Sequence, residues 1–333
     1  LSVAVAALMS VGLVGQAAAS TSAGSVIEYQ NLLITTTSIV ADVSNFSFTT
    51  TNTATLASDP PTVVDSDSCA GIPFVADNCN QAIWNGNVLD SELVTKGTTA
   101  HTENNFNLDG PSAGTTYSYA DSVIYTSELT PVPGQNTTAA SLIAETELNQ
   151  SDSGNSLSTI QSTTGFSFVF TVGDTGELSI SFEADPDAYS YSDNPGAVLT
   201  LAESSVAAVL TLTQNDGPGS ATWAPNGIAS PDDGTSGCSD LAGGVTCSGE
   251  TDDESLNQKT GVTSDPSYDP YSMDAQGSWS NFGITIGNLA VGDWTFTLTT
   301  TVANSVQKLL VPEPGMLMLL GMGMAGLAVT RRR

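Results

Sequence analysis

Residues 165–183 read GFSFVFTVGDTGELSISFE, and this stretch decides the fold class. Apolar residues occupy every second position on both sides of its centre: Phe166, Phe168, Phe170, Leu178, Ile180 and Phe182. Alternation with period two is typical of a β-strand that buries one face. Gly173-Asp174-Thr175-Gly176 between the two halves has the composition of a turn. The stretch therefore predicts an antiparallel hairpin.

The same alternation recurs along the chain. Extended stretches are predicted at 43–51, 117–126, 197–213, 282–286 and 294–298, the last continuing towards Val306. Ala-Ala-Val within 197–213 leaves a short helix open there. We expect an all-β protein, an antiparallel β-sandwich of jelly-roll-like type. A β-solenoid would require a short regular repeat, which the sequence does not show.

Two long polar insertions, near 58–111 and 215–277, interrupt a single domain expected to span residues 20–310. Each contains two cysteines, Cys69 with Cys79 and Cys238 with Cys247. In an oxidising compartment four cysteines allow three pairings, and we favour the two local ones because each closes a short loop. A zinc site is disfavoured, since neither pair is C-x-x-C and the sequence has one histidine.

Acidic residues far outnumber basic ones, with 35 Asp and Glu against 6 Lys and Arg and a formal net charge of −29. Phosphate binding needs clustered Lys and Arg, so nucleic acids and anionic lipid surfaces are excluded as partners. Cations and neutral glycans remain compatible with this charge. A hydrophobic content of 40% is too high for a wholly disordered chain.

The N-terminal residues have the character of a secretion signal. Leu1 to Val14 is almost entirely apolar or small, and Ala17-Ala18-Ala19 provides a small-residue cleavage site. We therefore expect a signal helix over 1–19, removed by signal peptidase. The basic first region and the initiator Met are missing, so we interpret the sequence as truncated at the front.

The C-terminal residues form a three-part tail. Val311-Pro312-Glu313-Pro314-Gly315 leads into the apolar run 316–329, and Arg331-Arg332-Arg333 follows. As a helix the run would span about 21 Å at ~1.5 Å per residue, short of a bilayer core of ~30 Å. The arginines favour the cytoplasmic side. The pattern predicts a short helix that holds the protein transiently at the inner membrane.

This tail, residues 311–333, resembles the PEP-CTERM sorting signal of Gram-negative bacteria. The resemblance implies cleavage by an exosortase at or beside Pro312-Glu313-Pro314, with Arg331, Arg332 and Arg333 as the stop-transfer element. It also implies release to the cell surface or the medium, in bacteria that make extracellular polysaccharide. Glu203-Ser204-Ser205-Val206 and Ala120-Asp121-Ser122-Val123 match only part of the E-D-S-A-x-x-A run of one subgroup.

The sequence contains no specific catalytic motif. Every Ser-His-Asp scheme would depend on His101, which lies in a polar insertion. Paired carboxylates for glycoside hydrolysis are defined by spatial rather than sequential spacing, and among 35 acids such pairs arise by chance. We therefore expect a protein that is not an enzyme.

Two kinds of binding site remain as hypotheses. Asp185, Asp187 and Asp193 follow a predicted strand and provide carboxylates of the kind that calcium binds, so they are the preferred metal site. Aromatic residues in or beside polar loops could stack on sugar rings: Tyr189, Tyr191, Tyr268, Tyr271, Trp223 and Trp279.

The functional expectation is an exported, exosortase-processed protein of the cell surface or extracellular matrix. Its role would be structural or adhesive, in the exopolysaccharide matrix of a biofilm. The alternative is a secreted carbohydrate-binding or carbohydrate-active β-sandwich protein.

Overall fold

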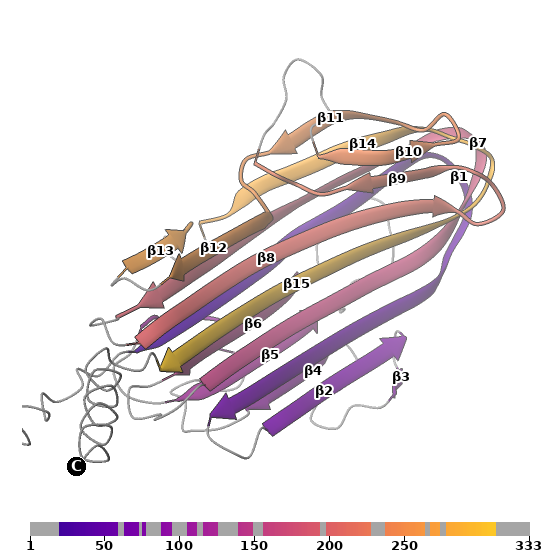
Figure 1. The fold of residues 1–333 in the computed structure, drawn as a ribbon. Coiled ribbons are helices and arrows are strands. Elements are labelled where there is room, and N and C mark those ends of the chain that lie inside the picture. The colour runs from indigo at the N-terminus through magenta and orange to yellow at the C-terminus, as the bar shows by residue number, and fades with distance from the viewer. Residues whose placement is uncertain are drawn as a thin grey trace, which may run out of the picture.

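The computed structural model describes residues 20–58, 63–72, 75–77, 88–94, 105–111, 116–125, 139–148, 156–193, 198–227, 237–263, 267–273 and 278–310. These residues form an all-β structure in which every strand pair is antiparallel (Figure 1). The strands are β1 (Thr21–Ser58), β2 (Val63–Ile72), β3 (Val75–Asp77), β4 (Val88–Val94), β5 (Tyr117–Tyr125), β6 (Ala139–Leu148), β7 (Ser156–Ser192), β8 (Val198–Gln214), β9 (Ser220–Trp223), β10 (Cys238–Ala242), β11 (Thr246–Asp252), β12 (Asn257–Thr263), β13 (Ser267–Tyr271), β14 (Ser280–Leu289) and β15 (Gly292–Leu310).

Two very long strands, β1 and β7, organise the fold. They pair from Thr21 opposite Ser192 to Ser58 opposite Ser156, with register shifts around 37–47. At these shifts both strands bend and pass from one layer of the structure to the other (Figure 1). A hydrogen-bonded ribbon of this length replaces the separate strands that the sequence suggested.

The bent ribbon generates two layers. Layer A contains β2, the 47–58 half of β1, the 156–172 half of β7, β15 and β8, with β9 and β12 both paired to β8. Layer B contains β4, β5, β6, the 21–37 half of β1, the 177–192 half of β7, and β14, with β11 beyond it and β13 beside β7. The antiparallel β-sandwich class is therefore confirmed. The strand order differs from that of a jelly roll, which consists of two Greek keys, because β1 and β7 here belong to both layers.

The predicted hairpin at 165–183 is wrong, although both of its halves are strands. β7 runs through Gly173 to Gly176 without reversing, and both halves pair with β1 instead of with each other. The four intervening residues preserve the period-two phase, so Phe170 and Leu178 are both buried on the concave side. β1 pairs with β7 on both sides of Gly173 to Gly176, from residue 156 to residue 172 and from residue 177 to residue 192, and a reversal at these four residues would forfeit that pairing.

The other predicted strands are present. The range 43–51 lies within β1, 117–126 corresponds to β5, and 197–213 corresponds to β8, which excludes the helix left open there. The two C-terminal stretches form β14 and β15, and β15 continues past Val306 to Leu310. The ranges expected as polar insertions contain strands of their own, β2 to β4 in 58–111 and β9 to β13 in 215–277.

Aromatic side chains from both layers fill the core near the bend. Phe168 stacks on Phe296 with ring centroids 4.9 Å apart, and Phe182 of layer B meets Trp223 of layer A at 6.0 Å. Farther from the bend the interior becomes polar. There Asn304 accepts a hydrogen bond from Ser25 at 3.0 Å and donates one to the carbonyl of Ala144. Cross-layer contacts of both kinds show that the two layers pack face to face.

Candidate functional site

Several predicted functional residues lie outside the described residues. They include the signal segment 1–19, His101, Cys79, and the whole tail with Pro312, Glu313, Pro314, Arg331, Arg332 and Arg333. The structure therefore tests neither the signal helix nor the C-terminal helix. Among the residues that it does describe, no helix is long and apolar enough to cross a membrane. β15 ends at Leu310, immediately before the tail.

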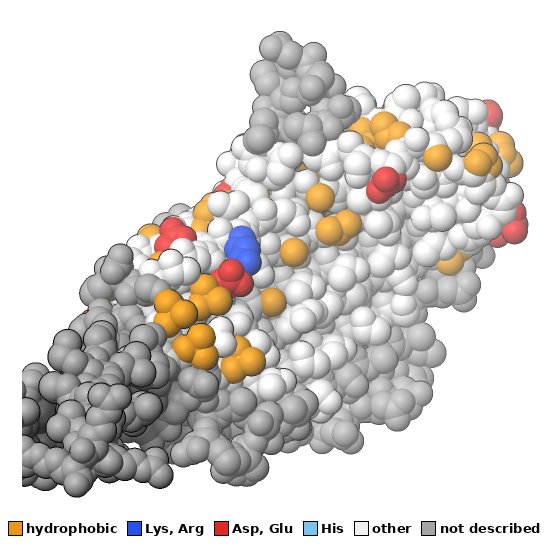
Figure 2. All heavy atoms as spheres, viewed as in Figure 1, with side chains coloured by type: hydrophobic (Ala, Val, Ile, Leu, Met, Phe, Trp, Pro, Cys, Tyr) orange, Lys and Arg blue, Asp and Glu red, His pale blue; other side chains and the backbone are white. Residues whose placement is uncertain are grey.

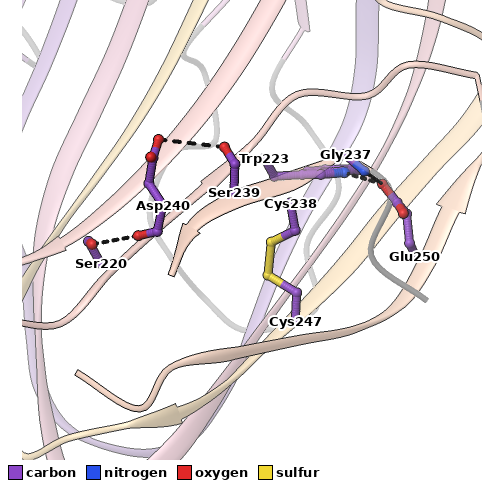
Figure 3. The surroundings of a disulfide bond; sticks show 8 residues. All are labelled: Ser220, Trp223, Gly237, Cys238, Ser239, Asp240, Cys247 and Glu250. Carbon is purple, nitrogen blue, oxygen red and sulfur yellow. Dashed lines mark hydrogen bonds between the residues drawn. A yellow bond between two sulfur atoms is a disulfide. The ribbon is translucent and has the colours of Figure 1, made fainter. Parts of the chain in front are cut away.

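One of the two predicted disulfides is present. Cys238 of β10 is bonded to Cys247 of β11, as Figure 3 shows. Beside it, the Glu250 carboxylate accepts hydrogen bonds from the indole of Trp223 at 2.8 Å and from the backbone of Gly237 at 3.2 Å. β10 pairs with β9 of layer A and β11 with β14 of layer B, so this bond joins the edges of the two layers. The pairing of Cys69 with Cys79 stays a prediction, because Cys79 is not described.

The structure does not bring the three carboxylates of the predicted calcium site together. Asp185 and Asp187 lie within β7, and Asp193 follows its last residue. No three His, Cys, Asp or Glu side chains of the described residues lie close enough together to hold a metal ion. The prediction took the three residues as a loop, which could fold back around an ion. The strand continues through them, and at about 3.3 Å per residue it holds Asp185 and Asp193 roughly 26 Å apart.

The aromatic residues proposed for sugar stacking divide into buried and exposed groups. Trp223 and Tyr189 are fully buried, so neither ring face is available to a ligand. Tyr268 of β13 is 47% exposed and lies directly opposite Tyr191 of β7, with ring centroids 6.4 Å apart. Tyr271 is half-buried, and its hydroxyl exchanges 2.9 Å hydrogen bonds with the backbone of Ser255. The exposed aromatic surface is thus a small patch at the edge of layer B.

The outward face of layer B carries many carboxylates. They come from four adjacent strands: Glu28, Asp121, Glu145, Glu147, Glu183, Asp185 and Asp187. The segment 105–111 covers part of this face, since Phe106 packs with Val26 and Tyr119. Glu145 lies under that segment and accepts hydrogen bonds from the backbone of Asp109 at 3.2 Å, from Gly110 at 3.0 Å and from the Tyr189 hydroxyl.

Tyrosine hydroxyls on the outward face of layer B resist ionisation. Burial, followed by the charge of Glu145, raises the pKa of Tyr189 well above its usual value. Burial and then Glu145, Glu147 and Asp109 raise the pKa of Tyr117 in the same way. A phenolate here would be poorly hydrated and close to several carboxylates, so both effects disfavour the charged form. Tyr189 donates a hydrogen bond to Glu145, and the raised pKa of each tyrosine keeps its hydroxyl neutral at physiological pH.

The outward face of layer A is different, and the sequence analysis did not identify it. We call it the hydroxyl face, defined as the outward side chains of 47–55 on β1, 159–167 on β7, 297–305 on β15 and 203–211 on β8. All five outward positions of β1 are Ser or Thr: Ser47, Thr49, Thr51, Thr53 and Thr55. The alternate residues Phe48, Thr50, Asn52 and Ala54 are buried.

Hydroxyls continue across the neighbouring strands in register. Thr163 and Thr301 face each other with their oxygens 3.1 Å apart, and Ser47 and Ser167 with theirs 2.7 Å apart. Gly165 leaves room for Thr49, whose Oγ1 would lie 2.6 Å from a Cβ at that position. Figure 2, viewed from the same side as Figure 1, shows a surface that is mostly white, the colour of uncharged polar side chains and backbone.

The hydroxyl face has one acidic side chain, Glu203, and it is neutralised. Lys259 of β12 forms an ion pair with Glu203 at 3.0 Å. A depression of about 330 Å³ crosses the face here, from β1 to β12. Its lining includes Thr53, Thr159, Gln161, Ser205, Ala303 and Ser305. The signal that could have identified this face is the unbroken alternation of hydroxyl residues from Ser47 to Thr55 and from Thr295 to Thr301.

Two viral structures are among the solved structures to which this chain is similar. The infectious bursal disease virus VP2 subviral particle is 12% identical, with 95% of this chain and 88% of that chain covered and a TM-score of 0.09. A structure of the Gx strain of the same virus is 11% identical, with 91% and 81% covered and a TM-score of 0.08. Scores this low carry no argument about fold. No curated protein matches the sequence.

The comparison with family models concerns the tail. Residues 310–333 match the family described as PEP-CTERM protein-sorting motif. The matched range contains all three parts recognised in the sequence: the Pro-Glu-Pro element, the apolar run and the terminal arginines. Such a motif implies exosortase-dependent sorting to the cell envelope or surface. The chain therefore carries a PEP-CTERM protein-sorting motif at residues 310–333, which begins at Leu310, the final residue of β15.

Proposed function

We propose that an exosortase cleaves this protein at or beside Pro312-Glu313-Pro314, after transient anchoring in the inner membrane of a Gram-negative bacterium. A signal peptidase acts at the other end, beside Ala17-Ala18-Ala19. The released domain then serves as a structural or adhesive component of the exopolysaccharide matrix. The sorting motif at 310–333 is the observation that carries the proposal.

The position of the motif supports a role for the folded domain after cleavage. The last pair of β15 with β8 is Leu310 opposite Val198, so cleavage beyond residue 311 removes no strand pair. Loss of the three arginines takes the net charge from −29 to about −32. A domain with this charge stays soluble outside the cell and resists non-specific association.

A non-enzymatic role fits the described residues better than catalysis does. The buried carboxylate Glu145 is held by backbone and tyrosine donors under the 105–111 segment, which leaves it no open cavity for a substrate. The depression on the hydroxyl face contains one carboxylate, Glu203, already paired with Lys259. Glycoside hydrolysis ordinarily needs two.

Cell fractionation combined with intact mass measurement tests the sorting proposal. We expect the surface or matrix fraction to contain a form that ends at or beside residues 312–314. A variant carrying Pro312→Ala, Glu313→Gln and Pro314→Ala should stay in the membrane fraction with Arg331-Arg332-Arg333 still attached. A surface form of the unmodified protein that retains all three arginines contradicts exosortase processing. Hydrolysis of matrix polysaccharide by the purified protein contradicts the non-enzymatic role.

A further inference from the structure

We infer that the hydroxyl face of layer A binds an uncharged, hydroxyl-rich polysaccharide. The inference rests on the matrix role proposed above and names the surface and the class of polymer. It depends on three features of the described residues: the distribution of charge, the array of hydroxyls, and the depression that crosses them.

The charge distribution selects a neutral partner. On the outward face of layer B, Glu28, Glu183 and Asp187 are partly exposed, whereas Asp121, Glu145, Glu147 and Asp185 are buried. The hydroxyl face carries Glu203 alone, paired with Lys259 at 3.0 Å. The hydroxyl face therefore presents no unpaired carboxylate, although the whole chain has a net charge of −29. An acidic polymer would be repelled by the protein as a whole, whereas a neutral one has no charge to desolvate.

The hydroxyl array suits a sugar polymer. A Ser or Thr hydroxyl both donates and accepts hydrogen bonds, as a sugar hydroxyl does. Adjacent strands are about 4.8 Å apart, so a polymer lying across them meets a new row of hydroxyls at each strand. Threonine is β-branched and has few χ1 rotamers in a strand, so its side chain loses little conformational entropy when a ligand binds. The pairs Thr163 with Thr301 and Ser47 with Ser167 show that these hydroxyls are already aligned across strands.

The depression gives the polymer a defined path. It crosses β1, β7, β15, β8 and β12 in one line, with Thr53, Thr159, Ser305 and Ser205 along it. A volume of about 330 Å³ is at the lower end of the range for small-ligand sites. The hydroxyl face contains no aromatic side chain, so binding here depends on many hydrogen bonds and threonine methyl contacts rather than on ring stacking. Each sugar unit then binds weakly, and affinity grows with polymer length.

Affinity electrophoresis of the purified chain tests this inference. Native gels contain dextran or hydroxyethyl cellulose as neutral probes, or alginate as an acidic probe. The test variant combines Thr53→Val, Thr159→Val and Thr301→Val, which keep the shape and strand propensity of threonine but remove its hydroxyl. The matched control combines Thr175→Val, Thr246→Val and Thr251→Val, three exposed threonines away from the hydroxyl face. Ala303→Glu places a carboxylate in the depression.

The neutral probes should retard the unmodified chain and the control variant equally, with little dependence on salt. The test variant and Ala303→Glu should each bind at least tenfold more weakly, a change of about 1.4 kcal/mol. Equal retardation of the test and control variants overturns the inference, as does retardation by alginate alone. A change in sedimentation of the test variant, with no change in polysaccharide binding, identifies the face as a self-interface and also overturns it.

The cell-free gels separate this inference from the proposed function. A protein that reaches the matrix in cells but binds no neutral polymer in gels overturns the inference alone. A protein that binds in gels but is absent from the matrix of fractionated cells contradicts the matrix role.

Discussion

Replacing Gly24 by alanine tests the long β1–β7 ribbon directly. Gly24 of β1 lies opposite Tyr189 of β7 on the outward face of layer B. A Cβ on Gly24 would lie 2.5 Å from Cε1 of Tyr189 and 2.8 Å from Cδ2 of Leu108. The Leu108 tip can rotate away. The Tyr189 ring is fully buried and its hydroxyl is bonded to Glu145, so it cannot move without losing that bond.

The expected destabilisation follows from two opposing effects. Overpacking of a buried site costs about 1–3 kcal/mol. Replacing Gly by Ala lowers the entropy of the unfolded chain, which contributes about 0.4–1 kcal/mol in the other direction. The net loss in unfolding free energy should be about 1–2 kcal/mol, or a fall in Tm of roughly 2–4 °C for a domain of this size. Gly261→Ala is the control, because the nearest atom to its added Cβ is 3.7 Å away and no clash opposes the entropic gain.

Equilibrium urea unfolding, followed by tryptophan fluorescence, measures both variants. A second comparison places Gly24→Ala in a Tyr189→Ser background, where the ring is absent and the penalty should disappear. The register would be refuted if Gly24→Ala and Gly261→Ala were equally stable, or if the Gly24→Ala penalty were the same with and without the tyrosine ring. A hairpin at 173–176 would pair the two halves of β7 with each other and give no reason for Tyr189 to cover Gly24.

Three further changes probe the disulfide, a tyrosine and the surface ion pair. Replacing Cys238 and Cys247 by serine should lower the unfolding free energy by about 2–3 kcal/mol, the chain-entropy value for a loop of this length. Urea unfolding measures this loss. If no loss were found, the hydrogen bonds of Glu250 to Trp223 and Gly237 would be sufficient to hold β10 in place. Burial, and then Glu254, raises the pKa of Tyr271 to about 12. The neutral Tyr271 hydroxyl should therefore contribute fully to stability below pH ~10, which is the pKa of tyrosine in the unfolded chain. This contribution should be lost as the pH rises towards 12. In thermal unfolding at alkaline pH, Tyr271→Phe should remove this pH-dependent loss of stability. Lys259→Ala should leave Tm unchanged within error, because the Lys259 and Glu203 side chains are 60% and 39% exposed and such pairs contribute less than ~1 kcal/mol. A measurable fall in Tm would show that the ion pair stabilises the fold.

The strands could be predicted from the sequence because alternation is a local property. Phe166 to Phe170, Leu178 to Phe182 and Trp294 to Leu298 each display the period-two pattern within a few residues, and each is part of a strand. Their pairing could not be predicted in the same way. Gly173 to Gly176 has the composition of a turn, but the residues on either side of it, Val172 and Glu177, pair with β1 residues more than 130 positions away. The residues of the turn alone do not show whether the two halves of β7 pair with each other or with a distant strand.

The candidate sites show the same division between local and non-local information. The bond between Cys238 and Cys247 closes a short loop and was predictable from spacing and export. The calcium hypothesis assumed that Asp185 and Asp187 lie in a loop, whereas the structure places both of them in β7. The hydroxyl face was missed because it exists only when four strands, from β1 to β8, are placed side by side. A single strand shows at most a row of alternating hydroxyls, as from Ser47 to Thr55, and does not show that neighbouring strands extend it into a surface.

The arrangement of the chain separates delivery from activity. The sorting motif spans 310–333, and the register of β15 with β8 ends at its first residue, Leu310 opposite Val198. Cleavage at or beside residues 312–314 thus leaves the pairing of β15 with both β7 and β8 intact. It also leaves the depression intact, because Ala303 and Ser305 lie several residues before the cut. Since sorting and surface binding use residues that do not overlap, variants of one should leave the other unchanged. That independence is what allows the sorting proposal and the polysaccharide inference to fail separately.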